Sequence, residues 1–169
     1  MPTLEDFASN EQIKAEYKKT FLLSLFRKIC VKMNRNPQYR TKIQTLFRET
    51  HDKAETTQII VRRELKYDLS RDEAKQISEW IWANLKKSSR RKAIPLSVKR
   101  ELYVRQNGKC TVCGEPLGTD WSAIHVDHII PWALVGDELP DNYQDLCETC
   151  NECKSARTDY IFQRMIELI

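Results

Sequence analysis

Two closely spaced cysteine pairs constrain the fold of this chain more than any other feature of its sequence. Cys110 and Cys113 form the first C-x-x-C pair, and Cys147 and Cys150 form the second. Two thiolates from one tight turn can reach the same metal ion, so two such pairs supply the four ligands of a tetrahedral zinc site. Gly114 suits the sharp turn at such a knuckle. We therefore predict a structural Zn²⁺ bound by these cysteines, with free buried thiols as the alternative.

The rest of the sequence favours metal-bound or free thiols over disulfides. The chain begins MPTLEDFASNEQ, which is acidic and polar and lacks the basic and then apolar order of a secretory signal. It contains no run of about eighteen apolar residues, the length that predicts a membrane span. We therefore expect a cytoplasmic protein, and disulfides are rare in that reducing compartment. Of the other two cysteines, Cys30 is expected in an apolar core and Cys153 as a bystander of the zinc site.

The N-terminal half carries helical patterns and no glycine. Apolar residues recur there at every fourth position, at Ile13, Tyr17, Phe21, Leu25, Ile29 and Met33. This spacing predicts a helix from Glu11 with one buried stripe, ended by the proline at position 37. Two further helices are predicted at about 38–50 and 53–67. A fourth follows Ser70, because Ser70 and Glu73 form a capping-box pattern.

These patterns divide the chain into two predicted domains joined by a linker. Four helices can bury a small core, so we predict a helical domain at 1–87, with a role in DNA binding, dimerisation or partner docking. The polar and basic stretch 88–95 is predicted to be the linker. Residues 96–169 hold all four glycines and five of the six cysteines, and their patterns predict one or two strands between helices. The predicted fold class is therefore α+β, mostly α.

A second group of chemically active side chains lies around the second cysteine pair. The segment VDHIIP places Asp127 and His128 at the end of a predicted strand, and Asn142 follows in a turn-rich loop. Asn151 comes directly after the last cysteine of the quartet, and Lys154 is three residues further on. This order, with a cysteine pair on each side, resembles the HNH endonuclease family. The third position is Asn rather than His, so the resemblance is to an HNN variant.

The resemblance implies a ββα-metal (HNH) nuclease domain stabilised by zinc, in which a β-hairpin and a helix hold one divalent ion against a DNA phosphate. His128 would then be the general base that takes a proton from water. Asp127 and Asn151 would offer oxygen ligands, which suit Mg²⁺ or Mn²⁺ as the catalytic ion. Asn142 would belong to the catalytic group without touching the metal, by holding His128 in its orientation.

Positive charge accumulates between residues 86 and 109, within a chain of net charge +4. A solvated linker is one interpretation, but beside a nuclease domain we expect a DNA-backbone contact, which gives affinity without reading sequence. The expected nucleic-acid contacts, including those next to the proposed site, are Arg90, Arg91, Lys92, Lys99, Arg100, Arg105, His125, Lys154 and Arg157.

The predicted function is that of a metal-dependent endonuclease that hydrolyses DNA phosphodiester bonds, as a restriction or phage-defence nuclease. The alternative is a non-catalytic zinc-stabilised module that binds DNA or a protein. That module would need the cysteines and the basic run but not Asp127, His128 and Asn151. The expected partner is double-stranded DNA, with RNA left open as a substrate. A homodimer or a nuclease subunit of a larger system is also expected, since cutting both strands with one single-metal site calls for two copies.

Overall fold

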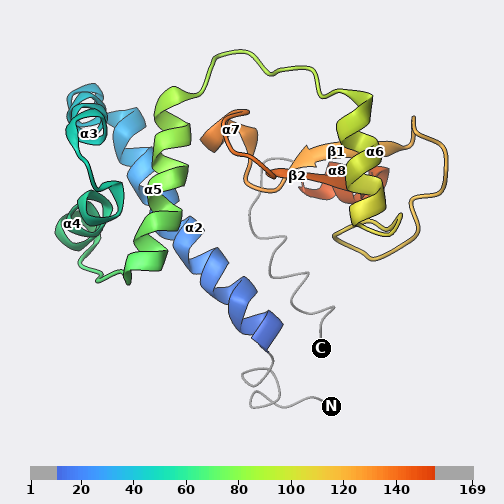
Figure 1. Cartoon of the computed structure of the whole chain (residues 1–169), viewed down its shortest axis with the longest axis horizontal. Coiled ribbons are helices and arrows are strands. Elements are labelled where there is room, and N and C mark those ends of the chain that lie inside the picture. Colours follow the sequence, from blue (N-terminus) through green and yellow to red (C-terminus); the bar gives the residue numbers. More distant parts are fainter. Residues whose placement is uncertain (1–10, 155–169) are drawn as a thin grey trace. The chain divides into compact units, whose positions relative to one another are not determined.

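The structure is a computed structural model that describes residues 11–154 (Figure 1). In chain order, its elements are α2 (Glu11–Arg35), α3 (Pro37–Glu49), α4 (Lys53–Leu65), α5 (Arg71–Lys86), α6 (Leu96–Arg105), β1 (Ile124–His128), α7 (Trp132–Val135), β2 (Tyr143–Cys147) and α8 (Glu148–Lys154). Helices dominate, and the strands form one two-stranded sheet, which confirms the α+β, mostly α class. In this part of the chain, no helix is long and apolar enough to cross a membrane.

The chain groups into two compact units. One unit, here called the helical unit, comprises residues 21–89 together with the segment 134–139. The other, here called the hairpin unit, includes residues 90–133 and 140–154, and the described start of α2 at 11–20 is grouped with it. Each unit is described by itself below.

Side-chain caps set the starts of helices in the helical unit. Asn36 accepts a hydrogen bond from the N–H of Tyr39 at 3.0 Å, and Pro37 takes the first helical position of α3, where its missing N–H is no loss. Ser70 accepts from the N–H of Glu73, whose carboxylate in turn accepts from the N–H of Ser70. The predicted capping box is therefore confirmed.

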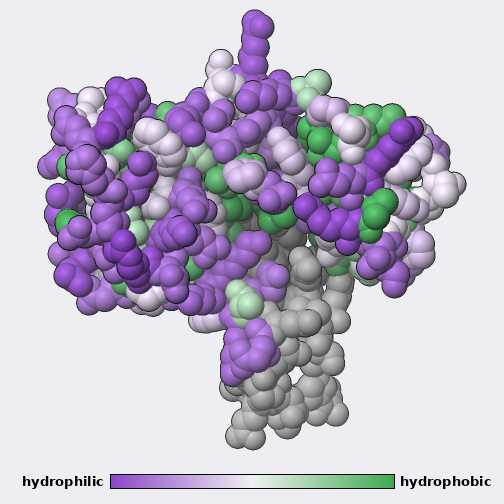
Figure 2. All heavy atoms as spheres, in the orientation of Figure 1, coloured by the Kyte–Doolittle hydropathy of each residue, from purple (hydrophilic) through white to green (hydrophobic). Residues whose placement is uncertain are grey.

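The apolar faces of all four helices meet in one core. Its fully buried side chains include Phe26, Ile29, Met33, Ile43, Phe47, Ile60, Val61, Ile77 and Ile81. Cys30 is also buried, as expected of a core residue. The outer surface over α3 and α4 is mainly hydrophilic on the face drawn in Figure 2.

The predicted apolar stripe of the first helix is wrong at Tyr17, whose side chain is exposed. A four-residue spacing advances about 400° around a helix, so a stripe of six such positions drifts by about 40° per step and leaves one face. The buried face of α2 takes in Leu22 and Phe26 as well, which the four-residue pattern left out.

A short segment after α7 packs within the helical unit. The Asn84 side-chain amide donates to the Leu134 carbonyl oxygen at 2.6 Å. Gly136 has a φ of +63°, and a Cβ added there would lie 2.7 Å from Cβ of Lys87, so only glycine fits this approach. Neither α7 nor this packing was predicted from the sequence.

The hairpin unit is built around the antiparallel pair β1 and β2. The register aligns Ile124 with Cys147 at one end and His128 with Tyr143 at the other. Helix α8 packs against both strands, and α6 packs against β2 (Figure 1). The buried apolar side chains of this unit are few, and they include Leu102, Val112, Leu117, Ile124, Ile130 and Leu146. A core this small contributes little to the stability of the fold, and small domains of this kind are often stabilised further by a structural metal ion.

Candidate functional site

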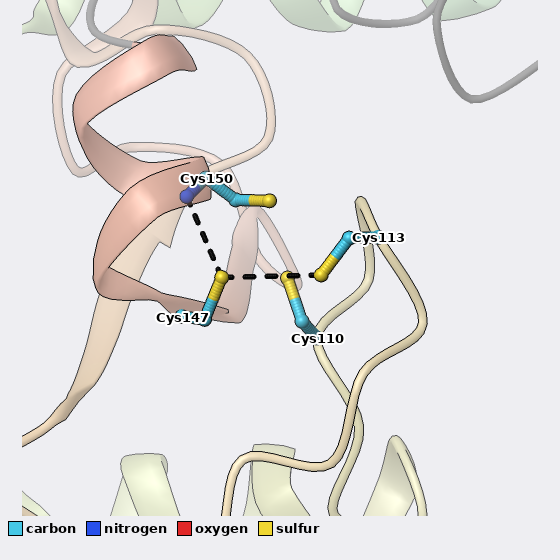
Figure 3. Close-up of side chains that lie close together, drawn as sticks. All are labelled: Cys110, Cys113, Cys147 and Cys150. Atoms are coloured by element: carbon cyan, nitrogen blue, oxygen red, sulfur yellow. Dashed lines mark hydrogen bonds between the residues drawn. The ribbon is translucent and has the colours of Figure 1, made fainter.

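The four cysteines of the two C-x-x-C pairs lie together at one end of the hairpin, with their thiols directed toward a common point (Figure 3). Their Sγ atoms all lie within 4.8 Å of one another. Sγ of Cys113 and Sγ of Cys147 are 3.9 Å apart, which is far beyond a disulfide bond. Tetrahedral coordination at about 2.3 Å per Zn–S bond requires sulfur pairs about 3.8 Å apart. The cluster is therefore placed to bind Zn²⁺, as the spacing predicted.

The local backbone prepares these thiols for a metal. Gly114 has a φ of +75°, which closes the first knuckle, and the N–H of Cys150 points to Sγ of Cys147 at 3.4 Å. Burial raises the pKa of Cys150, and the neighbouring thiols raise it further. Cys110 is also desolvated, but backbone N–H groups of the knuckles outweigh that effect and lower its pKa. A bound cation would remove the repulsion among thiolates, so metal binding and folding are coupled here.

A buried ion pair joins the end of β1 to α8. The Lys154 ammonium lies 2.5 Å from Oδ2 of Asp127 and donates to the His128 carbonyl oxygen at 2.7 Å. Lys154 is only 2% exposed, so its donors are directed inward. This corrects the expectation that Lys154 contacts a phosphate. Asn151 is half-buried and lies three residues before Lys154, so it shares the face of α8 that meets β1.

Asn142 locks the chain that leaves β1. Its side-chain oxygen accepts from the N–H of Ile130 at 2.8 Å, and its amide donates to the carbonyl oxygen of the same residue at 2.9 Å. Its own carbonyl accepts from the N–H of Ile129 at 2.9 Å. Since these bonds hold the two residues that follow His128, Asn142 fixes the backbone there. His128 as a residue is 3% exposed, and its ring packs on that of Tyr143 with centroids 4.8 Å apart.

A cleft of about 510 Å³ opens in the hairpin unit beside β1. Its lining includes Arg91, Lys92, Lys99, His125 and His128, and none of the described residues that line it is acidic. Three cations and two imidazoles around one concave surface concentrate positive potential, which favours a polyanion. The structure thus brings part of the predicted basic run to the strand that carries His128.

Other members of the basic run lie elsewhere. Arg105 forms an exposed ion pair with Asp141, at 3.4 Å. Arg90 and Arg100 are exposed and do not line the cleft. Arg157 lies outside the described residues. Of the described members of the run, these three arginines therefore lie outside the cleft lining.

Sequence reasoning missed two residues that shape the hairpin. The Gln106 side chain pairs with the backbone of Asp145, accepting from its N–H at 2.8 Å and donating to its carbonyl at 3.0 Å. The Asp145 carboxyl is fully buried, and neither of its oxygens receives a hydrogen bond from the described residues. Burial raises the pKa of this carboxyl to about 6, against the opposing effect of the Lys99 ammonium. No sequence signal marked either residue, because a glutamine and an aspartate are ordinarily solvated.

Comparison with known proteins gives a match over much of the hairpin unit but not over residues 21–89 of the helical unit. No curated protein and no solved structure matches the chain. Residues 110–157 match the family model described as HNH endonuclease. The match begins at the first cysteine of the quartet and continues through the hairpin and α8, so it covers Asp127, His128, Asn142 and Asn151. The chain therefore carries an HNH endonuclease domain over residues 110–157.

Proposed function

We propose that the chain is a metal-dependent endonuclease that hydrolyses DNA phosphodiester bonds at the end of β1. The observation that carries this proposal is the buried contact of Lys154 with Asp127 and with the backbone of His128. It joins the Asp127 carboxylate and the backbone of His128 to α8, the helix that carries Asn151. A module that only bound DNA would have no use for such a group.

The donor set of this region fits a hard divalent cation. Asp127 has 15% of its side chain exposed, so one end of the carboxylate is within reach of solvent, and Asn151 offers an amide oxygen. Two oxygen donors with room for water suit Mg²⁺ or Mn²⁺ better than a second zinc. Such an ion would neutralise charge on the phosphoryl oxygens and stabilise the leaving oxygen.

The residues of the chain supply the proton transfer and the orientation. An imidazole nitrogen of His128 accepts a proton from a water molecule. The oxygen of that water forms the new bond to phosphorus, and the P–O ester bond breaks. The ring is kept in place by Tyr143 on one side, and Asn142 fixes the backbone that follows it. His128 reaches substrate through the cleft that it lines.

The cleft supports DNA as the polyanion. Arg91 stands over the ring of Trp132 at 5.6 Å, and the Lys99 ammonium donates to the Trp121 carbonyl oxygen at 2.5 Å. These contacts restrain two cations beside the proposed site, and the phosphates of a DNA strand are the ligand that they fit. We further propose that the zinc cluster is the scaffold of the site, and that the chain serves in restriction or phage defence, as a homodimer or as the nuclease subunit of a larger system.

A plasmid-nicking assay tests the proposal. Zinc-loaded protein is expected to nick plasmid DNA with Mg²⁺ or Mn²⁺ and to stop when EDTA is added, with activity restored by excess Mg²⁺. His128→Ala is expected to keep zinc and DNA binding while its cleavage rate falls by about 10²-fold or more, the usual contribution of a general base.

His51→Ala is the matched control, since His51 is an exposed histidine of the helical unit. It should cleave like the wild type. Equal cleavage by His128→Ala and wild type would end the assignment of the base. Absence of metal-dependent cleavage in every preparation that binds DNA would favour a non-catalytic zinc module instead.

A further inference from the structure

Lys154 is an unusual group to find in a protein interior. Its side chain is 1% exposed, and a lysine is almost never fully buried without a charged partner. The partner here is Oδ2 of Asp127, at 2.5 Å, and the ammonium also reaches the His128 carbonyl oxygen. Oδ2 is itself buried, and the ammonium compensates its charge. Breaking this pair would leave an uncompensated buried charge, which is strongly unfavourable.

The ion pair makes the two oxygens of Asp127 unequal. Oδ2 is buried and lies 2.5 Å from the Lys154 ammonium, whereas the Asp127 side chain as a whole is 15% exposed, so Oδ1 is the oxygen nearer to solvent. A cation that approaches from the solvent side therefore finds one oxygen available rather than two. A carboxylate constrained in this way binds a metal through a single oxygen.

The number of carboxylate oxygens distinguishes the common divalent cations. Mg²⁺ demands near-octahedral geometry and is bound through one or two carboxylates with several retained waters. Ca²⁺ takes six to eight oxygen ligands and readily uses both oxygens of one carboxylate. An arrangement that withholds one oxygen therefore disfavours Ca²⁺ more than Mg²⁺ or Mn²⁺.

We propose that Lys154 is a positioning residue that holds Asp127 as a one-oxygen ligand, and that it thereby selects Mg²⁺ and Mn²⁺ against Ca²⁺ at the proposed catalytic site. This inference rests on the proposed function, in which Asp127 is a ligand of the cation. It assigns the ammonium to the carboxylate and not to the DNA. The lysine acts through Asp127 and touches no reacting atom.

Competition for bound Mn²⁺ tests this proposal without relying on cleavage. Zinc-saturated protein free of DNA is loaded with Mn²⁺, and the bound ion is followed by electron paramagnetic resonance during titration with Mg²⁺ or with Ca²⁺. The quantity compared is the ratio of the Mg²⁺ and Ca²⁺ dissociation constants. Removing a positive charge strengthens binding of both divalent ions alike, so this ratio cancels the electrostatic effect.

Lys154→Met removes the ammonium and keeps much of the apolar stem. It is expected to strengthen Ca²⁺ binding relative to Mg²⁺ binding by roughly tenfold. Losing a residue that hydrogen-bonds to a metal ligand typically changes metal affinity by about 10-fold to 100-fold, and this expectation takes the low end. Lys154→Gln keeps an N–H donor for Oδ2, so its ratio should return most of the way to that of the wild type. Lys109→Met is the matched control, because it deletes an exposed lysine of the same unit and should leave the ratio unchanged.

The outcomes separate this inference from the proposed function. If Asp127→Asn bound Mn²⁺ as well as the wild type, Asp127 would not be a ligand and the proposed site would fail. If Asp127→Asn lost Mn²⁺ but Lys154→Met kept the wild-type ratio, only the role of Lys154 would be overturned. Should Lys154→Met lose zinc or fail to fold, the wild-type titration still decides, since a preference for Ca²⁺ over Mg²⁺ there contradicts the proposal.

Discussion

The buried carboxyl of Asp145 yields a prediction whose sign and size follow from its surroundings. Asp145 lies on β2 opposite Val126, is fully buried, and has no hydrogen-bond donor among the described residues for either oxygen. The perturbation is Asp145→Asn, which removes the charge and keeps the shape. Because a buried unpaired carboxylate opposes folding, the variant is expected to be more stable than the wild type near neutral pH.

The magnitude follows from the pKa of this carboxyl. Burial raises it from 3.8 to about 6, a difference of about 2.2, which corresponds to at most about 3 kcal/mol. Protonation of the Asp145 carboxyl therefore stabilises the folded chain. The full gain in the free energy of unfolding is present below about pH 4, and it is lost as the pH rises through 6. A buried amide carries its own cost, so we expect Asp145→Asn to gain about 1–2 kcal/mol near neutral pH.

Hydrogen exchange of the β1 and β2 amides, measured by NMR on zinc-saturated protein, reports the opening free energy of the hairpin unit alone. The matched control is Asp120→Asn. Asp120 is exposed, and hydrogen bonds from Ser122 lower its pKa, so losing its charge should not stabilise the unit. Faster exchange in Asp145→Asn than in the wild type would refute the reasoning, because it would mean that the carboxylate has a partner that favours its ionised form.

Two further predictions concern the metal cluster and the cleft. Cys147→Ser should lose zinc and lower the melting temperature of the hairpin unit, whereas Cys153→Ser, outside the quartet, should keep both; normal melting of zinc-free Cys147→Ser would contradict the scaffold role. Arg91→Ala and Lys99→Ala should each weaken DNA binding and reduce the slope of log affinity against log salt by about 1, measured by fluorescence anisotropy. Arg105→Ala, which is ion-paired outside the cleft, should change the slope less, and equal effects of all three would remove the cleft as the binding surface.

Local signals in the sequence predicted the parts of the structure that depend on neighbouring residues. The spacing within each C-x-x-C pair placed the thiols, because a tight turn brings both sulfurs to one side. Ser70 and Glu73 set the start of α5 through bonds between residues three positions apart. The α+β class followed from the same local periodicities.

The remaining features depend on packing between distant residues, which periodicity does not encode. Helical spacing placed Lys154 on the same face as Asn151 but could not say that this face is buried against β1. The alternation of β2 permitted Asp145 to face inward but gave no reason for burying an acid. The close packing of Gly136 against Lys87 joins segments far apart in the chain, and no local sequence pattern predicts it.

Asp127 and Asn151 are proposed to hold a divalent cation beside His128, and the position of that ion can be measured directly. Anomalous diffraction at the manganese edge, from crystals of the zinc-loaded protein soaked in Mn²⁺, locates that ion independently of activity. The account predicts a manganese peak at roughly 2–2.5 Å from Oδ1 of Asp127 and from the amide oxygen of Asn151. A manganese ion located where it contacts neither Asp127 nor Asn151 would contradict this prediction.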